Sequence, residues 1–184
     1  MSTTVKIRAA TLSDAGAIAK VHVIAWRTAY VNIMPQTHLD SLRIEEKVTL
    51  WKQILSDSCK AANVLVAEEQ TQGTRLLGFV SFGDAAAPSP NRRAFVNGAI
   101  KTGELRAIYV DPQDWSKGAG RQLWKAAQEQ LIEAQFTTVA VLVLAKNERA
   151  IHFYEAVGFA KDGAGSIEVG GASLETVRLT KALN

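Results

Sequence analysis

The sequence is poor in cysteine, with Cys59 the single thiol among 184 residues. One cysteine excludes an internal disulfide framework and fits a reducing compartment, so the cytoplasm is the expected location. The three histidines are scattered along the chain, and no stretch has the ligand spacing of a zinc site. We therefore expect neither disulfides nor a bound metal.

Long apolar runs and a strong charge of one sign are also missing. No apolar stretch approaches the length that crosses a bilayer, and the N-terminus lacks the charged-then-apolar order of a signal peptide. The 21 basic and 18 acidic side chains leave a net charge of +3, which by itself does not argue for nucleic acid. We expect neither a membrane nor a nucleic acid as a partner.

The composition that remains is that of a globular protein. Apolar residues make up 47% of the chain and charged residues 21%. A length of 184 residues favours one domain, 1–184, with a sizeable core.

The most informative stretch runs from Glu104 to Leu131. Residues 105–110 are rich in β-branched and aromatic side chains and predict a strand, which Asp111-Pro112 ends. After Gly118-Ala-Gly120 the apolar residues recur at helical spacing, so the glycines stand at a helix N-terminus.

Such a helix start offers free backbone N–H groups and a positive dipole end, and glycine lets an anion approach closely. Lys117 and Arg121 add positive charge. These features predict a pyrophosphate-binding turn. The alternative is an ordinary strand-to-helix connection in which the glycines serve tight packing.

The remaining elements follow from periodicity and turn residues. Strands are expected at 5–8, 63–67, 76–82 and 137–144, and as a hairpin of 166–169 and 172–179. Helices are expected at 14–30, at 148–157, and once or twice within 39–58, and a loop is expected at 83–102. Strand runs combined with strand–helix–strand units give an α/β sheet of mixed direction.

Two aromatic residues on the first predicted helix are candidates for a substrate pocket. Trp26 and Tyr30 lie four residues apart and share a helix face. The alternative for either is packing against the sheet. His22 on the same helix is expected to be a packed or surface histidine.

A second motif spans Asn147 to Phe159. Asn147 is a good N-cap, Gly158 a good helix-ending residue, and Tyr154 lies two helical turns after Asn147 on the same face. Together with the loop at 111–121, this motif resembles the GNAT family of N-acetyltransferases. The resemblance covers nearly the whole chain.

The resemblance implies a fold and a cofactor. The fold is a mixed, mostly antiparallel seven-stranded sheet flanked by about four helices. Two central strands, ending near Val110 and Leu144, splay apart to form a cleft for acetyl-CoA. Where the family usually has glutamine or arginine this chain has Trp115, and where it usually has glycine this chain has Ser116.

The resemblance also assigns the cofactor-binding residues. Strand backbone would pair with the pantetheine arm, the N–H groups of 116–121 would hold the pyrophosphate, and Asn147 would bond the arm. The residues implied are Ile108, Tyr109, Val110, Trp115, Ser116, Lys117, Gly118, Ala119, Gly120, Arg121, Asn147 and Tyr154.

Three groups are candidates for catalysis. By resemblance, Tyr154 protonates the departing CoA thiolate and the backbone N–H near Val110 polarises the acetyl carbonyl. Acyl transfer also needs a deprotonated amine, and Glu104 is the candidate base, directly or through water. The alternatives are a packed tyrosine at 154 and an ordinary exposed carboxylate at 104.

These features predict an acetyl-CoA-dependent N-acetyltransferase that transfers the acetyl group directly to a primary amine of a small molecule or peptide. Trp26, Tyr30 and Glu104 are the expected substrate contacts, and residues 26–39, the loop at 83–102 and the final hairpin should set specificity. The alternatives are a non-catalytic CoA-binding sensor and, within the enzyme class, a protein N-terminal acetyltransferase. The sequence leaves the oligomeric state open, although homodimers are common in the family and a homodimer is therefore one expectation.

Overall fold

A computed structural model describes residues 5–56, 62–70, 74–86 and 101–183. Seven strands form one sheet in the order β1-β2-β3-β4-β5-β7-β6. The strands are β1 (Val5–Ala9), β2 (Asn63–Gln70), β3 (Thr74–Asp84), β4 (Thr102–Val110), β5 (Thr138–Leu144), β6 (Ala160–Val169) and β7 (Ala172–Ala182). The helices are α1 (Ala15–Ala29), α2 (Gln36–Ser41), α3 (Ile44–Ser56), α4 (Ala119–Glu133) and α5 (Glu148–Ala156), with short 3-10 turns η1 (Leu12–Asp14) and η2 (Pro112–Asp114).

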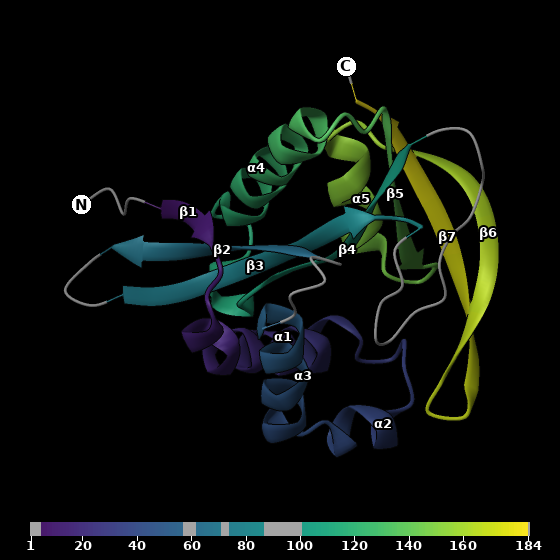
Figure 1. Cartoon of the computed structure of the whole chain (residues 1–184). Helices are drawn as coiled ribbons and strands as arrows, with labels where there is room; N and C mark the ends of the chain where they lie inside the picture. The colour runs from purple at the N-terminus through teal and green to yellow at the C-terminus, as the bar shows by residue number, and fades with distance from the viewer. Residues whose placement is uncertain (1–4, 57–61, 71–73, 87–100, 184) are drawn as a thin grey trace.

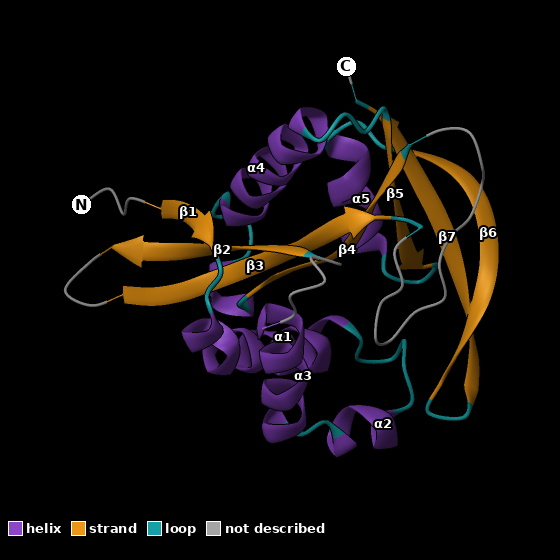
Figure 2. Cartoon of the chain, viewed as in Figure 1, coloured by secondary structure: helices purple, strands orange, loops and turns teal. Residues whose placement is uncertain are grey.

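The helices cover the sheet on both faces. Helices α4 and α5 lie on one side and α1, α2 and α3 on the other (Figures 1 and 2). On the α4 side the core includes Leu105, Leu123 and Trp124, and on the α1 side Ile18 and Phe79. The expected mixed, mostly antiparallel sheet with flanking helices is confirmed.

Strands β4 and β5 are parallel neighbours that pair over a short length. Their register covers Thr102↔Thr138, Gly103↔Val139 and Glu104↔Ala140, and ends there. Beyond Glu104 the two strands part, while β4 continues to pair with β3 as far as Val110. The splayed central strands expected from the sequence are therefore present.

A bulge in β4 lies at the point of parting. Ser81 of β3 pairs with Ala107, but the next residue, Phe82, pairs with Leu105, so Arg106 is the extra residue. A bulge bends its strand and increases the local twist. This bend directs the second half of β4 away from β5.

Several element boundaries differ from the expectation. The region 39–58 holds two helices, of which α2 begins earlier, at Gln36, while residues 57–61 lie outside the described part. The expected loop at 83–102 is shortened by β3, which runs to Asp84, and by β4, which starts at Thr102; residues 87–100 lie outside the described part. Glu104 is thus the third residue of its strand.

The largest boundary error concerns β6, which begins at Ala160 and not at residue 166. Its first nine residues are exposed, and Gly163 and Gly165 interrupt any apolar alternation. This edge strand forms by pairing with β7 along its length. A strand without a buried face leaves no period-2 signal in the sequence.

Candidate active site

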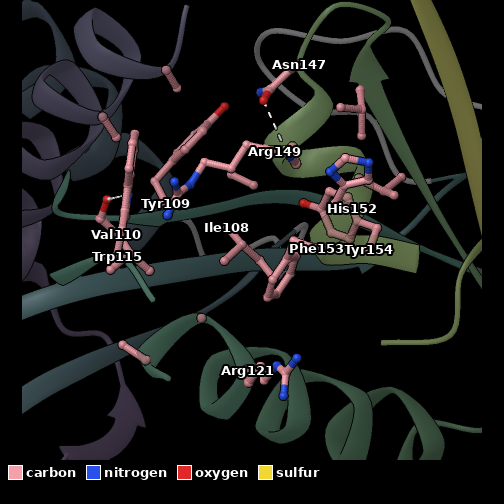
Figure 3. Close-up of a pocket in the computed structure, with 18 of the residues that line it drawn as sticks. Ile108, Tyr109, Val110, Trp115, Arg121, Asn147, Arg149, His152, Phe153 and Tyr154 are labelled. Atoms are coloured by element: carbon pink, nitrogen blue, oxygen red, sulfur yellow. Dashed lines mark hydrogen bonds between the residues drawn. The ribbon is translucent and has the colours of Figure 1, made fainter. Parts of the chain in front are cut away.

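The parting of β4 and β5 opens a cleft of about 970 Å³. Figure 3 shows that side chains from β4, the first turn of α4 and α5 surround this space. Most residues predicted for the site line it: Tyr30, Ile108, Tyr109, Val110, Trp115, Ser116, Gly118, Ala119, Gly120, Arg121, Asn147 and Tyr154. The predicted residues Trp26, Glu104 and Lys117 are not part of this wall.

The turn before α4 has the backbone shape of an anion site. Gly118 caps the helix in a left-handed conformation with φ of 93°, and Ser116 is also left-handed with φ of 65°. An added Cβ on Gly120 would lie 3.4 Å from the Phe153 ring of α5, which is ordinary van der Waals contact. Gly118 therefore serves the turn, and the first turn of α4, which lines the cleft, has N–H groups without intrahelical partners.

Lys117 points to a different partner. Its Nζ lies 3.1 Å from Asp114 Oδ1, while Arg75 Nη1 lies 2.7 Å from Asp114 Oδ2. The hydrogen bond from Arg75, followed by that from Lys117, lowers the pKa of the Asp114 carboxyl despite its burial. Arg75 thus joins η2 to β3, Lys117 adds a second bond to the same carboxylate, and Arg121 in the first turn of α4 lines the cleft.

Trp115 ties the start of the turn to the end of β4. Its indole Nε1 donates to the Val110 carbonyl at 2.8 Å. The Arg149 guanidinium of α5 lies 4.0 Å from the centre of the Trp115 ring, and its Nη2 is 3.4 Å from Ser116 Oγ. Arg149 therefore reaches from α5 to the turn before α4, on the wall of the cleft (Figure 3).

Helix α5 carries the second motif as expected. Asn147 is the N-cap, and its side chain accepts from the Ala150 N–H at 3.1 Å. Gly158 follows the helix with φ of 93°, and the Phe159 N–H bonds the Tyr154 carbonyl. The Tyr154 side chain is buried between Phe153 and Phe159 but contributes to the cleft wall.

Burial raises the pKa values of two tyrosines that line the cleft. Burial, reinforced by the nearby Tyr109, raises the pKa of Tyr154 above its ordinary range. Burial also raises the pKa of Tyr30, whose Oη lies 3.4 Å from Tyr109 Oη. Both side chains line the cleft, and the raised pKa keeps each phenol protonated at neutral pH.

Glu104 lies at the closed end of the cleft, behind its wall. Its side chain is 6% exposed, so it is not the exposed carboxylate of the alternative interpretation. Its Oε2 is 3.4 Å from Nε of Arg106, which does line the cleft. Arg106 and Arg149 are site residues that the sequence reasoning missed. The signal for Arg106 was a charge within an apolar strand, and that for Arg149 was its place in the Asn147–Phe159 motif.

Trp26 belongs to an aromatic cluster next to the cleft. Its ring is 5.1 Å from His22 and 5.3 Å from Tyr30, so it stands behind the tyrosine that lines the wall. His22 is buried, accepts from Trp51 Nε1 at 3.1 Å and stacks on Tyr109 at 5.3 Å. The expectation of a packed histidine is confirmed, while a substrate role for Trp26 stays a prediction.

Two of the three segments expected to set specificity meet beside this cluster. An added Cβ on Gly170, in the turn between β6 and β7, would lie 2.7 Å from His38 Cβ on α2. Val169 and Leu174 of the hairpin pack against the same small core as Leu39.

Within the described residues, no helix combines the length and the apolar character needed to span a membrane.

Comparisons with known proteins agree with this geometry. A sequence model described as the acetyltransferase (GNAT) family matches residues 23–159. The relative named Uncharacterized N-acetyltransferase YuaI, from Bacillus subtilis (strain 168), is 35% identical over 175 residues, which are 95% of this chain and 91% of the relative.

Solved structures share the fold. PaiA N-acetyltransferase from Thermoplasma acidophilum, in complex with coenzyme A, has a TM-score of 0.68 at 18% identity, covering 97% of this chain and 99% of that one. YncA from Salmonella typhimurium, with its cofactor acetyl-CoA, has a TM-score of 0.67 at 20% identity, covering 98% and 94%. The family match takes in both motifs and both parted strands, and on this ground the chain belongs to the acetyltransferase (GNAT) family.

Proposed function

We propose that this protein transfers the acetyl group of acetyl-CoA directly to a primary amine. The observation that carries the proposal is the parting of β4 and β5 after Glu104, which leaves an unpaired strand edge between the start of α4 and Tyr154. Two solved relatives with this fold hold coenzyme A and acetyl-CoA. Family membership supports the same cofactor here.

The cleft offers a matching place for each part of the cofactor. The pyrophosphate binds the N–H groups at the start of α4, with Arg121 beside them. The pantetheine arm lies along Ile108–Val110 and pairs with the backbone as an added strand would. The Asn147 oxygen is engaged by the helix cap, and its amide N–H₂, which also interacts with the Tyr30 phenol, is the group proposed to bond the arm.

The chemistry is a single acyl transfer. The amine nitrogen attacks the thioester carbon, the N–C bond forms and the C–S bond breaks. An ammonium acceptor gives up two protons in all, of which one goes to solvent through a base and one ends on the CoA sulfur. Backbone N–H groups of β4 between Val110 and Ile108, where β4 no longer pairs with β5, stabilise the negative charge on the carbonyl oxygen.

Tyr154 is the proposed partner of the sulfur. Because burial raises its pKa, the phenol arrives with its proton and donates a hydrogen bond to the developing thiolate. A thiol has an ordinary pKa of about 8.5, below that of the phenol. The main contribution of Tyr154 is therefore the hydrogen bond to the sulfur in the transition state. The proton that ends on the sulfur is replaced on Tyr154 by one of the two protons that the acceptor releases.

Glu104 is the proposed base, acting through water. It lies behind Arg106 and outside the wall of the cleft, so a bridging water is the route that fits its position. A non-catalytic CoA-binding protein is the second candidate. It is favoured by the same recessed position of Glu104 and by the Val110 carbonyl, which the Trp115 indole already occupies.

Two measurements on the full chain test the proposal. Acetyl-CoA should raise the melting temperature, since it binds the folded state, and thiol release from acetyl-CoA should depend on an added primary amine. In Tyr154→Phe the turnover should fall about tenfold or more, as for loss of a positioned proton donor, with the acetyl-CoA-induced melting shift retained. Binding without amine-dependent release would favour the non-catalytic alternative, and the absence of both would reject the cofactor assignment.

A further inference from the structure

Arg106 places a positive charge at the closed end of the cleft. It is the bulged residue of β4, two positions after the last pair with β5, and it lines the cleft. Its side chain is 7% exposed. A guanidinium taken this far out of water needs hydrogen-bonding partners, and here those partners are few.

The contacts of Arg106 leave binding capacity unused. Its Nε is 3.4 Å from Glu104 Oε2, and its Nη2 donates to the Asp84 carbonyl at 3.2 Å. Both distances lie at the long end for hydrogen bonds to a guanidinium. Its third nitrogen, Nη1, makes no hydrogen bond with any residue in the described part of the chain. The fork of a guanidinium matches the two oxygens of a carboxylate.

The position of Arg106 relates it to the acceptor and not to the cofactor phosphates. The proposed cofactor path starts at α4 and follows β4 from Val110 back to Ile108, so the thioester comes to lie at the deep end. Arg106 lies two residues before Ile108 on β4 and also lines the cleft, so it is about 7 Å farther along the strand at the usual rise per residue. Arg121, Arg149 and the start of α4 lie at the opposite end of β4.

We propose that Arg106 binds the carboxylate of the acceptor, and that the acceptor is a free α-amino acid. The inference rests on the proposed acetyl transfer. An α-amino acid separates its nitrogen from its carboxylate by a single carbon, so an anion site just beyond the reacting centre selects this class over simple amines and peptide N-termini. The acceptor carboxylate takes the guanidinium, and Glu104, relieved of its long contact with Arg106, accepts a proton from the ammonium group.

The bond changes balance without a further reactant. The amino nitrogen forms the amide bond as the C–S bond breaks. Of the two protons that leave the ammonium group, one passes through Glu104 to solvent and the other ends on the CoA thiol. The products are an N-acetyl amino acid and CoA.

The test compares each amino acid with its amide, in which the carboxylate is replaced by an uncharged carboxamide. The standard L-α-amino acids that carry a primary amine are assayed with acetyl-CoA beside their amides, with thiol release and product mass as readouts. We expect at least one acid to exceed its amide by about 10- to 100-fold in kcat/KM, as for loss of a hydrogen bond to a charged group. Amides or carboxylate-free amines that serve equally well would overturn the inference while leaving the transferase assignment intact.

Variants of Arg106 give an independent readout. Arg106→Gln should raise KM for the amino acid about 10- to 100-fold, with the acetyl-CoA KM and the acetyl-CoA-induced melting shift unchanged. If Arg106→Gln does not fold because the ion pair with Glu104 is lost, Arg106→Lys is tested instead, since lysine keeps the charge but lacks the planar guanidinium. An unchanged amino-acid KM in the folded variant overturns the inference. Failure of every amino acid as acceptor also overturns it, and a simultaneous absence of the melting shift would remove the proposed function as well.

Discussion

At the scale of single residues, Ser116 combines a strained backbone with a place on the wall of the cleft. Its φ of 65° lies in the left-handed region, which costs an L-residue about 1–2 kcal/mol. Its side chain is exposed, and its contact with Arg149 is long, at 3.4 Å. The usual glycine of the family at this position therefore has a conformational reason.

Ser116→Gly should stabilise the protein by up to about 1 kcal/mol, because relief of the left-handed backbone exceeds the added freedom of the unfolded chain. Urea unfolding followed by tryptophan fluorescence measures the change. Ser116→Ala is the matched control, since it removes the same hydroxyl and keeps the strain. A glycine variant no more stable than the alanine variant would refute the explanation by strain.

His22 gives the fold a dependence on pH. Burial, followed by the nearby Lys47, lowers the pKa of His22 to about 3, whereas the unfolded chain has the ordinary value of 6.5. Between these values the unfolded state binds a proton that the folded state does not, so stability falls as the pH falls from 6.5. The Asp14 pKa is lowered to about 2, chiefly by the hydrogen bond from Arg8, and the stability it gives is lost only below 3.8.

His22→Asn should therefore flatten the loss of stability between pH 6.5 and 4. The slope that disappears is at most one proton, or about 1.4 kcal/mol per pH unit. Urea unfolding of both proteins at four pH values in this window measures it. Parallel slopes would show that His22 is not the group responsible.

At the scale of elements, the β6–β7 hairpin makes a close contact with α2. Gly170 has φ of 57°, and an added Cβ would meet His38 Cβ at 2.7 Å. Gly171 beside it has φ of 78°, with nothing within 4 Å of an added Cβ. Substitution of Gly171 thus tests backbone strain alone, whereas substitution of Gly170 tests strain together with a steric clash.

Gly171→Ala should cost about 1–2 kcal/mol, from the left-handed backbone alone. Gly170→Ala should cost at least about 1 kcal/mol more, because the hairpin tip must also move away from α2. Chemical denaturation gives both values, and acceptor KM reports whether the tip shapes the acceptor side. Equal losses for the two variants would argue against a tight contact at His38.

Elements with a buried face could be predicted from the sequence, and those without one could not. The apolar run of β5 and the helix from Asn147 to Gly158 were correct because burial and capping leave direct signals. The first half of β6 was missed because all its side chains are exposed. The sequence predicted a strand from residue 105, but β4 starts at Thr102, so Glu104 lies within the strand and is buried. The bulge at Arg106 was missed because it depends on pairing with β3, which the sequence of β4 alone does not specify.

At the scale of the whole molecule, the sheet is incomplete without its proposed cofactor. The residues of the cleft come from α1, β4, β5, the turn before α4, and α5. The family motifs identified two segments of the cleft wall, the turn before α4 and helix α5, since those have a fixed sequence pattern. Arg106 and the α1 residues of the cleft wall are far apart in the chain, so the place of Arg106 at the cleft emerged only from the fold.

Acetyl-CoA should slow amide hydrogen exchange in residues 106–110. Exchange there requires release of the added arm, so protection should rise about 100-fold when the ligand is present at 100 times its Kd. Strand β6, at the far edge of the sheet, serves as the internal control. Protection spread evenly over the sheet, with no excess at β4, would contradict pairing of the arm with this strand.

The gap between β4 and β5 also bears on how long the protein survives in a cell. If bound acetyl-CoA pairs with β4 as proposed, the sheet opens locally more often when acetyl-CoA is scarce. Proteases cleave such locally opened chains first. The abundance of the protein would then track the acetyl-CoA supply, so that a starved cell holds less of the enzyme that would otherwise spend its remaining acetyl groups.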